Sequence, residues 1–232
     1  MKLAPIYRRF LLLKEDGEAP GQLELRKTPI DKAVQYIEGL GIEIEDLQSH
    51  LEIAYDLFNM GKTKRADMPV IDDKDVRDFQ MKLKNGLIDL KDPFSDRTDP
   101  SDPFPQGLTD KSATQFMSNG LRDKEKPDDQ VQTQIKMIPA KDLIPIQQQV
   151  YLDKSVKSIA KFGVESSKQF LNSTVLITSA DNRIIDGHHR FLSALIIDPD
   201  IKLKCLVVNL EIKVLLPLAQ AYGDAIGNKR NL

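Results

Sequence analysis

Cysteine is almost absent from the chain: Cys205 is the only one in 232 residues, so no disulfide can form within it. Long apolar runs are missing too, because no stretch approaches the roughly 18 apolar residues that a membrane helix needs. The apolar run at residues 10–13 is followed at once by charge and is too short for the core of a signal peptide. These absences predict a protein of a reducing, cytoplasmic compartment that does not enter a membrane.

The sequence also lacks an internal repeat, the Cys and His spacing of zinc sites, and a strong excess of positive charge. Its net charge of −2 hides an asymmetry: residues 133–232 hold 13 Lys and Arg against 9 Asp and Glu, whereas residues 1–132 hold 20 against 26. The excess in the second part is too small for a protein that coats DNA, which normally presents a dense basic stripe.

Residues 1–90 are typical of a mainly helical module. Apolar residues recur at steps of three and four from Ile44 to Phe58 and predict one amphipathic helix, and a second helix is predicted from about Asp73. The intervening residues 61–71 are too many for the tight turn of a helix-turn-helix. We therefore favour an interaction or support module over a DNA reader.

Residues 91–132 are rich in proline and acidic residues, with only scattered apolar residues between them. Such a segment cannot bury enough apolar surface to order itself alone. The composition predicts a linker, or an arm that lies on the surface of a partner protein.

Residues 133–232 alternate between predicted strands and helices, which indicates a compact domain. The predicted elements are a strand (135–138), an irregular loop (139–149), a helix (152–162), a hairpin (175–177 with 183–185), a helix after it, a strand (203–210) and a closing helix (about 217–226). The fold class predicted for the whole chain is α/β (α+β), with a mainly helical N-terminal module.

The motif Asp186-Gly187-His188-His189-Arg190 lies where a short apolar strand meets the next helix. The first N–H groups of a helix have no partner within it, and its dipole favours negative charge there, so helix starts bind anions. Gly187 lets a phosphate approach the backbone, Arg190 offers a planar fork for two oxygens, and the histidines add donors or a base. An ordinary turn explains Asp186 and Gly187, but not the three residues that follow.

The order of these elements resembles the ParB/sulfiredoxin superfamily over about residues 133–215. The resemblance is carried by the motif just described and by a stretch similar to that family's first box, Ile138-Pro139-Ala140-Lys141-Asp142-Leu143-Ile144-Pro145. It implies a compact α/β domain that binds a nucleotide such as ATP, ADP or CTP. The phosphates would be held by Gly187, His188, His189 and Arg190.

Three branches of this superfamily differ in chemistry, and the sequence departs from each. ParB partition proteins have an arginine-rich loop and a DNA-binding helical domain after it, whereas about forty residues follow the motif here. Sulfiredoxins carry a reactive cysteine where His188 stands. Free serine kinases share the Asp-Gly-x-His-Arg loop but use a glutamate of the first box as general base. This chain offers Gln147, Gln148 and Gln149 nearby, which can orient a substrate but cannot accept a proton.

The candidate catalytic residues are Asp186, His188 and His189. Asp186 beside a phosphate would repel it unless a cation lies between, so Mg²⁺ held by Asp186 and phosphate oxygens is the expected cofactor. Adjacent residues at a helix start point about 100° apart, so the two histidines are not expected to chelate one metal. We expect His189 to face the phosphates, while His188 packs or contacts substrate.

Three classes of function follow from these observations. The favoured one is a nucleotide-dependent phosphotransferase or phosphohydrolase. The alternative is a ParB-like nuclease or DNA-binding module, because the same loop could hold a DNA phosphate. The third is a non-catalytic assembly protein that uses the fold as a scaffold and binds a protein partner through its N-terminal part.

Overall fold

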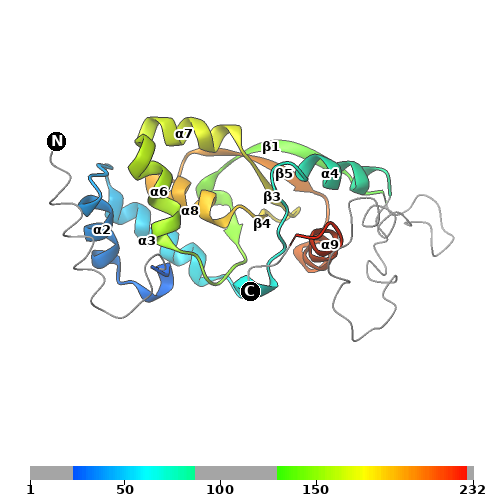
Figure 1. The fold of residues 1–232 in the computed structure, drawn as a ribbon, viewed down its shortest axis with the longest axis horizontal. Helices are drawn as coiled ribbons and strands as arrows, with labels where there is room; N and C mark the ends of the chain where they lie inside the picture. Colours follow the sequence, from blue (N-terminus) through cyan, green and yellow to red (C-terminus); the bar gives the residue numbers. More distant parts are fainter. Residues whose placement is uncertain (1–22, 87–129, 229–232) are drawn as a thin grey trace. The chain divides into compact units, whose positions relative to one another are not determined.

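The computed structural model describes residues 23–86 and 130–228 (Figure 1). Most of the predicted linker or arm at residues 91–132 lies outside this part of the chain. Over the described residues, seven helices and a mixed five-stranded sheet confirm the predicted α/β fold class. None of the described helices is long and apolar enough to cross a membrane.

The chain divides into two compact units that interleave along the sequence. Unit 1 comprises Met1–Lys62, Ile138–Thr174 and Gly187–Leu203, and unit 2 comprises Thr63–Met137, Val175–Asp186 and Lys204–Leu232. Segments from both the N-terminal and the C-terminal parts of the sequence therefore contribute to each unit.

Unit 1 is largely helical and is built around α8. Its elements are η1 (Leu25–Lys27), α2 (Ile30–Gly39), α3 (Leu47–Asn59), η3 (Ala140–Asp142), β2 (Ile144–Pro145), α6 (Leu152–Phe162), α7 (Val164–Ser173) and α8 (His188–Ile197). Helix α8 packs against α3, α6 and α7 (Figure 1). Every residue from Phe191 to Ile197 is buried, as expected of a helix that is apolar on most sides. The rings of Phe58 and Phe191 pack with centroids 5.6 Å apart.

One helix of unit 1 was not predicted, and the start of another differs from the sequence expectation. The helix predicted at 152–162 is confirmed as α6, and directly after Gly163 the chain enters α7, a helix that the sequence pattern did not predict. Gly163 has φ of 83°, a conformation that favours glycine and redirects the chain between the two helices. The apolar stripe expected to start at Ile44 starts as α3 at Leu47, because Asp46 adopts a left-handed conformation with φ of 56°.

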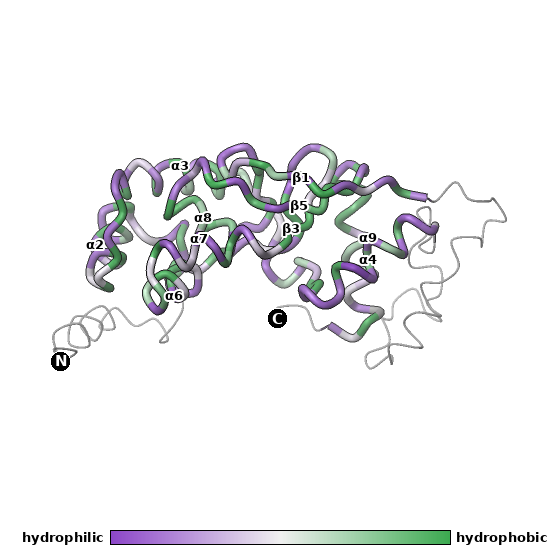
Figure 2. The backbone as a smooth tube through the Cα atoms, turned by 90° about the horizontal axis from the view of Figure 1, so that it is seen from above, coloured by the Kyte–Doolittle hydropathy of each residue, from purple (hydrophilic) through white to green (hydrophobic). Residues whose placement is uncertain are grey.

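Unit 2 contains most of the sheet. Its strands are β3 (Val175–Thr178), β4 (Arg183–Asp186) and most of β1 (Thr133–Pro139) and β5 (Lys202–Val208), and the sheet order is β1-β5-β3-β4-β2. Strand β3, coloured largely hydrophobic in Figure 2, runs parallel to β5 and places Ile177 opposite Leu206. It pairs antiparallel with β4, which confirms the predicted hairpin.

Helices α4 (Val76–Lys84) and α9 (Ile212–Ala225) complete the core of unit 2. The short helix η2 (Arg65–Asp67) also belongs to this unit. The rings of Phe79 and Tyr222 lie 4.8 Å apart, and the Tyr222 hydroxyl donates to the Asp78 carboxylate at 2.8 Å. The helix predicted from Pro217 in fact begins five residues earlier, so Pro217 lies inside it. An interior proline costs about 3 kcal/mol, and burial of the apolar residues on both sides of it offsets that loss.

Candidate functional site

The predicted strand, glycine and helix order at the motif is confirmed. Strand β4 ends at Asp186, Gly187 is the N-cap of α8, and the helix begins at His188. Gly187 has φ of 94°, which residues with a Cβ rarely adopt, and it has no side chain that could cap the first N–H groups. The backbone at this helix start therefore has the form that the anion-site hypothesis requires.

His188 is buried and fastens the loop that follows β2. Its side chain is 4% exposed, and its Nε2 accepts hydrogen bonds from the backbone N–H groups of Ile146 and Gln147, both at 3.3 Å. An Nε2 that accepts carries no proton, so the neutral ring is protonated at Nδ1. Burial, assisted by the nearby His189, lowers the pKa of His188 to about 3. His188 is thus neutral at physiological pH, and its side chain links the start of α8 to this loop.

His189 holds the far end of the same loop. Its Nε2 accepts from the backbone N–H of Tyr151 at 3.3 Å, and the two rings are stacked with centroids 6.2 Å apart and planes 13° apart. One turn along α8, the Ser193 hydroxyl lies 2.6 Å from the Ser155 carbonyl oxygen, which ties α8 to α6. The side chains of His188 and His189 point about 100° apart on α8, so the two rings contact the loop at its two ends, residues 146–147 and Tyr151.

All three histidines of the chain contact or belong to α8. The Nδ1 of His50 lies 3.1 Å from the Ile196 carbonyl oxygen near the C-terminal end of α8, where helix carbonyls lack partners within the helix. His50 is half-buried, and this contact links α3 to α8.

The Gln147, Gln148 and Gln149 segment lies on this clamped loop, so the structure brings these predicted substrate residues to the start of α8. Gln147 is buried and its side-chain amide donates to the Gln149 carbonyl, whereas Gln148 and Gln149 are half-buried. Of the three, the side chains of Gln148 and Gln149 are therefore the ones accessible to a ligand.

Gly61 supports the loop from the other side, and its part in the site was not predicted. A Cβ at Gly61 would lie 2.4 Å from the Gln147 carbonyl oxygen, and the neighbouring Lys62 N–H donates to the Ile146 carbonyl at 2.9 Å. The sequence placed residue 61 only in the segment between two predicted helices. Its close approach to residues 146–147, more than eighty positions away, has no local signal in the sequence.

Arg190 and Asp186 flank the helix start. Both side chains are half-buried, so Arg190 lies at the edge of unit 1 and not in its apolar interior. Asp186 presents a single carboxylate, and the described residues include no group of three or more His, Cys, Asp or Glu that could hold a metal ion. A single carboxylate suits Mg²⁺ only when the ligand's own oxygens and water complete the shell.

No family model, curated protein or solved structure matches this chain.

Proposed function

We propose that this protein binds a nucleotide through its phosphates at the start of α8, and that the site carries out phosphoryl transfer or hydrolysis of a phosphoester. The proposal rests chiefly on one observation: His188 and His189 fasten the loop of residues 146–151 to the first turn of α8. This loop directly follows residues 138–145, the stretch similar to the first box of the ParB/sulfiredoxin superfamily, and η3 within that stretch packs against α8.

The chemistry of the helix start supports a phosphate ligand. Gly187 leaves the backbone open to close approach, and the α8 dipole favours negative charge at this end. Arg190, in the first turn, carries a permanent charge and a planar fork that fits two phosphate oxygens. Gln148 and Gln149 could hydrogen-bond the nucleotide or the acceptor substrate.

The proposal gives the candidate catalytic residues different roles. His188 cannot serve as a base near neutral pH because its Nε2 already accepts two hydrogen bonds and its pKa is about 3. In this proposal Asp186 accepts the proton or holds Mg²⁺ with the phosphate oxygens, and His189 lies beside the phosphates. Mg²⁺ would neutralise charge that builds up on the transferred phosphoryl group.

Nucleotide binding to the full chain tests the proposal. We expect ATP, ADP or CTP, with Mg²⁺, to raise the melting temperature of the wild type, and Arg190→Ala to weaken binding by about 10- to 100-fold, the loss of a charge-assisted hydrogen-bond pair. Isothermal titration calorimetry measures the same affinity. Arg183→Ala is the matched control, because Arg183 pairs with Asp181 at 2.8 Å and has no part in the proposed site.

Three results would count against the proposal. If no nucleotide stabilises the wild type, the phosphate site is wrong. If both arginine variants lose binding equally, the effect is not specific to the α8 start. Nicking of plasmid DNA that Arg190→Ala abolishes, without nucleotide binding, would favour a ParB-like nuclease instead.

A further inference from the structure

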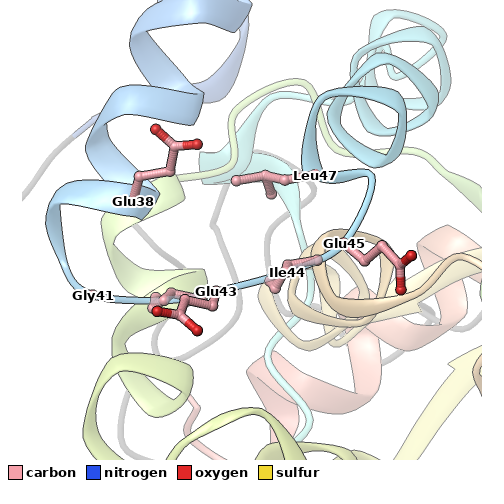
Figure 3. Close-up of a pocket in the computed structure, with 7 residues that line it drawn as sticks. Glu38, Gly41, Glu43, Ile44, Glu45 and Leu47 are labelled. Atoms are coloured by element: carbon pink, nitrogen blue, oxygen red, sulfur yellow. The ribbon is translucent and has the colours of Figure 1, made fainter.

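A recess in unit 1 lies between the end of α2 and the start of α3. It has a volume of about 570 Å³, within the range of ligand-binding clefts. Figure 3 shows Glu38 on the α2 side, Leu47 on the α3 side, and Gly41, Glu43, Ile44 and Glu45 along the connecting segment. We call this recess the acidic pocket.

The acidic pocket combines an apolar floor with a charged rim. Ile42 and Leu47 are buried and Ile44 is half-buried, whereas the three glutamates Glu38, Glu43 and Glu45 are exposed. The seven lining residues include these three glutamates and no Lys or Arg, and Lys168 lines only a neighbouring recess that shares Glu43, Ile44 and Glu45. A ligand that fits this surface carries apolar side chains together with positive charge.

One segment of the chain has this composition. Residues 1–14, which lie outside the described residues, contain Lys2, Arg8, Arg9 and Lys14 and no acidic residue. The same segment carries the apolar run of residues 10–13 identified in the sequence. We propose that residues 1–14 bind in the acidic pocket, with the apolar run against Ile44 and Leu47 and the arginines beside Glu43 and Glu45.

The first described residues place the anchor of this segment next to α2. The Leu23 N–H donates to an Asp153 carboxylate oxygen at 3.1 Å, and the Leu152 N–H donates to the Leu23 carbonyl at 2.7 Å. Burial raises the pKa of Tyr36 in α2 to about 12, and the negative charge of the nearby Asp153 adds to this increase. Tyr36 and Glu38, a rim residue of the acidic pocket, both belong to α2, whose ten residues span about 15 Å.

Chain length allows the connection. Ten peptide units separate residue 13 from Leu23, and an extended chain spans about 33 Å over that distance. The anchor and the acidic pocket both lie in unit 1, on or beside α2. Nine residues, 14–22, are therefore enough to connect them, and tethering raises the effective concentration of the segment at the acidic pocket.

Hydrogen exchange of the full chain, followed by mass spectrometry, tests this inference. In the wild type we expect the amides of residues 10–13 to exchange at least tenfold more slowly than an unstructured peptide. The double variant Glu43→Lys/Glu45→Lys should raise their exchange to the unstructured rate, because it places like charges beside Arg8 and Arg9. Combining it with Arg8→Glu/Arg9→Glu should restore protection.

The matched control is Glu52→Lys/Asp56→Lys, which makes the same charge change on exposed positions of α3 outside the acidic pocket. Circular dichroism of each variant checks that the fold is intact. Unprotected residues 10–13 in the wild type would overturn the inference. So would protection that Glu43→Lys/Glu45→Lys leaves unchanged, or that the control removes equally.

A synthetic peptide of residues 1–14 gives a second readout. The full chain carrying Arg8→Glu/Arg9→Glu should have a vacant acidic pocket, so the labelled peptide should bind it with a rise in fluorescence anisotropy. Binding should weaken at least tenfold when Glu43→Lys/Glu45→Lys is added. A peptide that does not bind, or that binds both proteins equally, contradicts the inference.

Discussion

Acidification should weaken unit 1 through His188. The ring is 4% exposed, its Nε2 accepts from two backbone N–H groups, and its pKa is lowered to about 3 from the ordinary 6.5. Below pH 6.5 the unfolded chain binds a proton at His188 that the folded chain excludes. The stability tied to the neutral ring is therefore complete above pH 6.5 and is lost as the pH falls toward 3.

The size of this loss follows from the two pKa values. At pH 5 the unfolded chain is protonated at His188 in most molecules, whereas the folded chain is not, and the difference from pH 7 amounts to about 2 kcal/mol in the free energy of unfolding. His188→Gln removes the titrating ring while keeping an acceptor, the Gln carbonyl oxygen, that can reach the same N–H groups.

Urea denaturation at pH 7 and pH 5, followed by circular dichroism, measures the effect. The wild type should lose about 2 kcal/mol more than His188→Gln over this interval, because all other titratable groups are present in both proteins. An NMR titration of the His188 ring should show no protonation above pH 5. Equal pH dependence in the two proteins, or protonation of His188 near pH 6.5, would refute the reasoning.

Two further predictions concern buried positions. Gly61→Ala should destabilise the protein by about 1–3 kcal/mol in urea denaturation and weaken nucleotide binding, because its Cβ would meet the Gln147 carbonyl oxygen at 2.4 Å. The control Gly39→Ala, with nothing within 4 Å of the added carbon, should have neither effect. Equal effects of the two substitutions would contradict the inference that Gly61 supports the loop of residues 146–151. Burial raises the pKa of the Cys205 thiol to about 12, so a thiol reagent at pH 8 should react only as fast as the protein unfolds, and rapid labelling of the folded chain would show the thiol to be accessible.

Local sequence signals were sufficient for the elements that carry the site. Apolar spacing and a terminal glycine give α6 over Leu152–Phe162, and the short strands on either side of residues 179–182 give the β3–β4 hairpin. Gly187 gives the change from strand to helix. These features depend on side-chain periodicity and on backbone conformations that single residues favour, so neighbouring residues suffice to determine them.

Packing between distant segments overrode local signals elsewhere. Pro217 suggested a helix start, yet it lies inside α9 because the apolar residues around it are buried in the core of unit 2. Gly163 ends α6 as predicted, but α7, which follows it, was not predicted, and its Ser167 and Leu171 are buried against the rest of the chain. The interleaving of the two units likewise has no signal in composition, since it depends on which elements bury each other's apolar faces.

The sequence by itself determined that two histidines and an arginine begin a helix after a glycine. Only the tertiary structure decided what the histidines do, because their partners, the N–H groups of Ile146, Gln147 and Tyr151, lie about forty positions earlier in the chain. The charge and protonation of a ring depend on its burial and its hydrogen-bond partners. Both are properties of the packed chain and not of the motif.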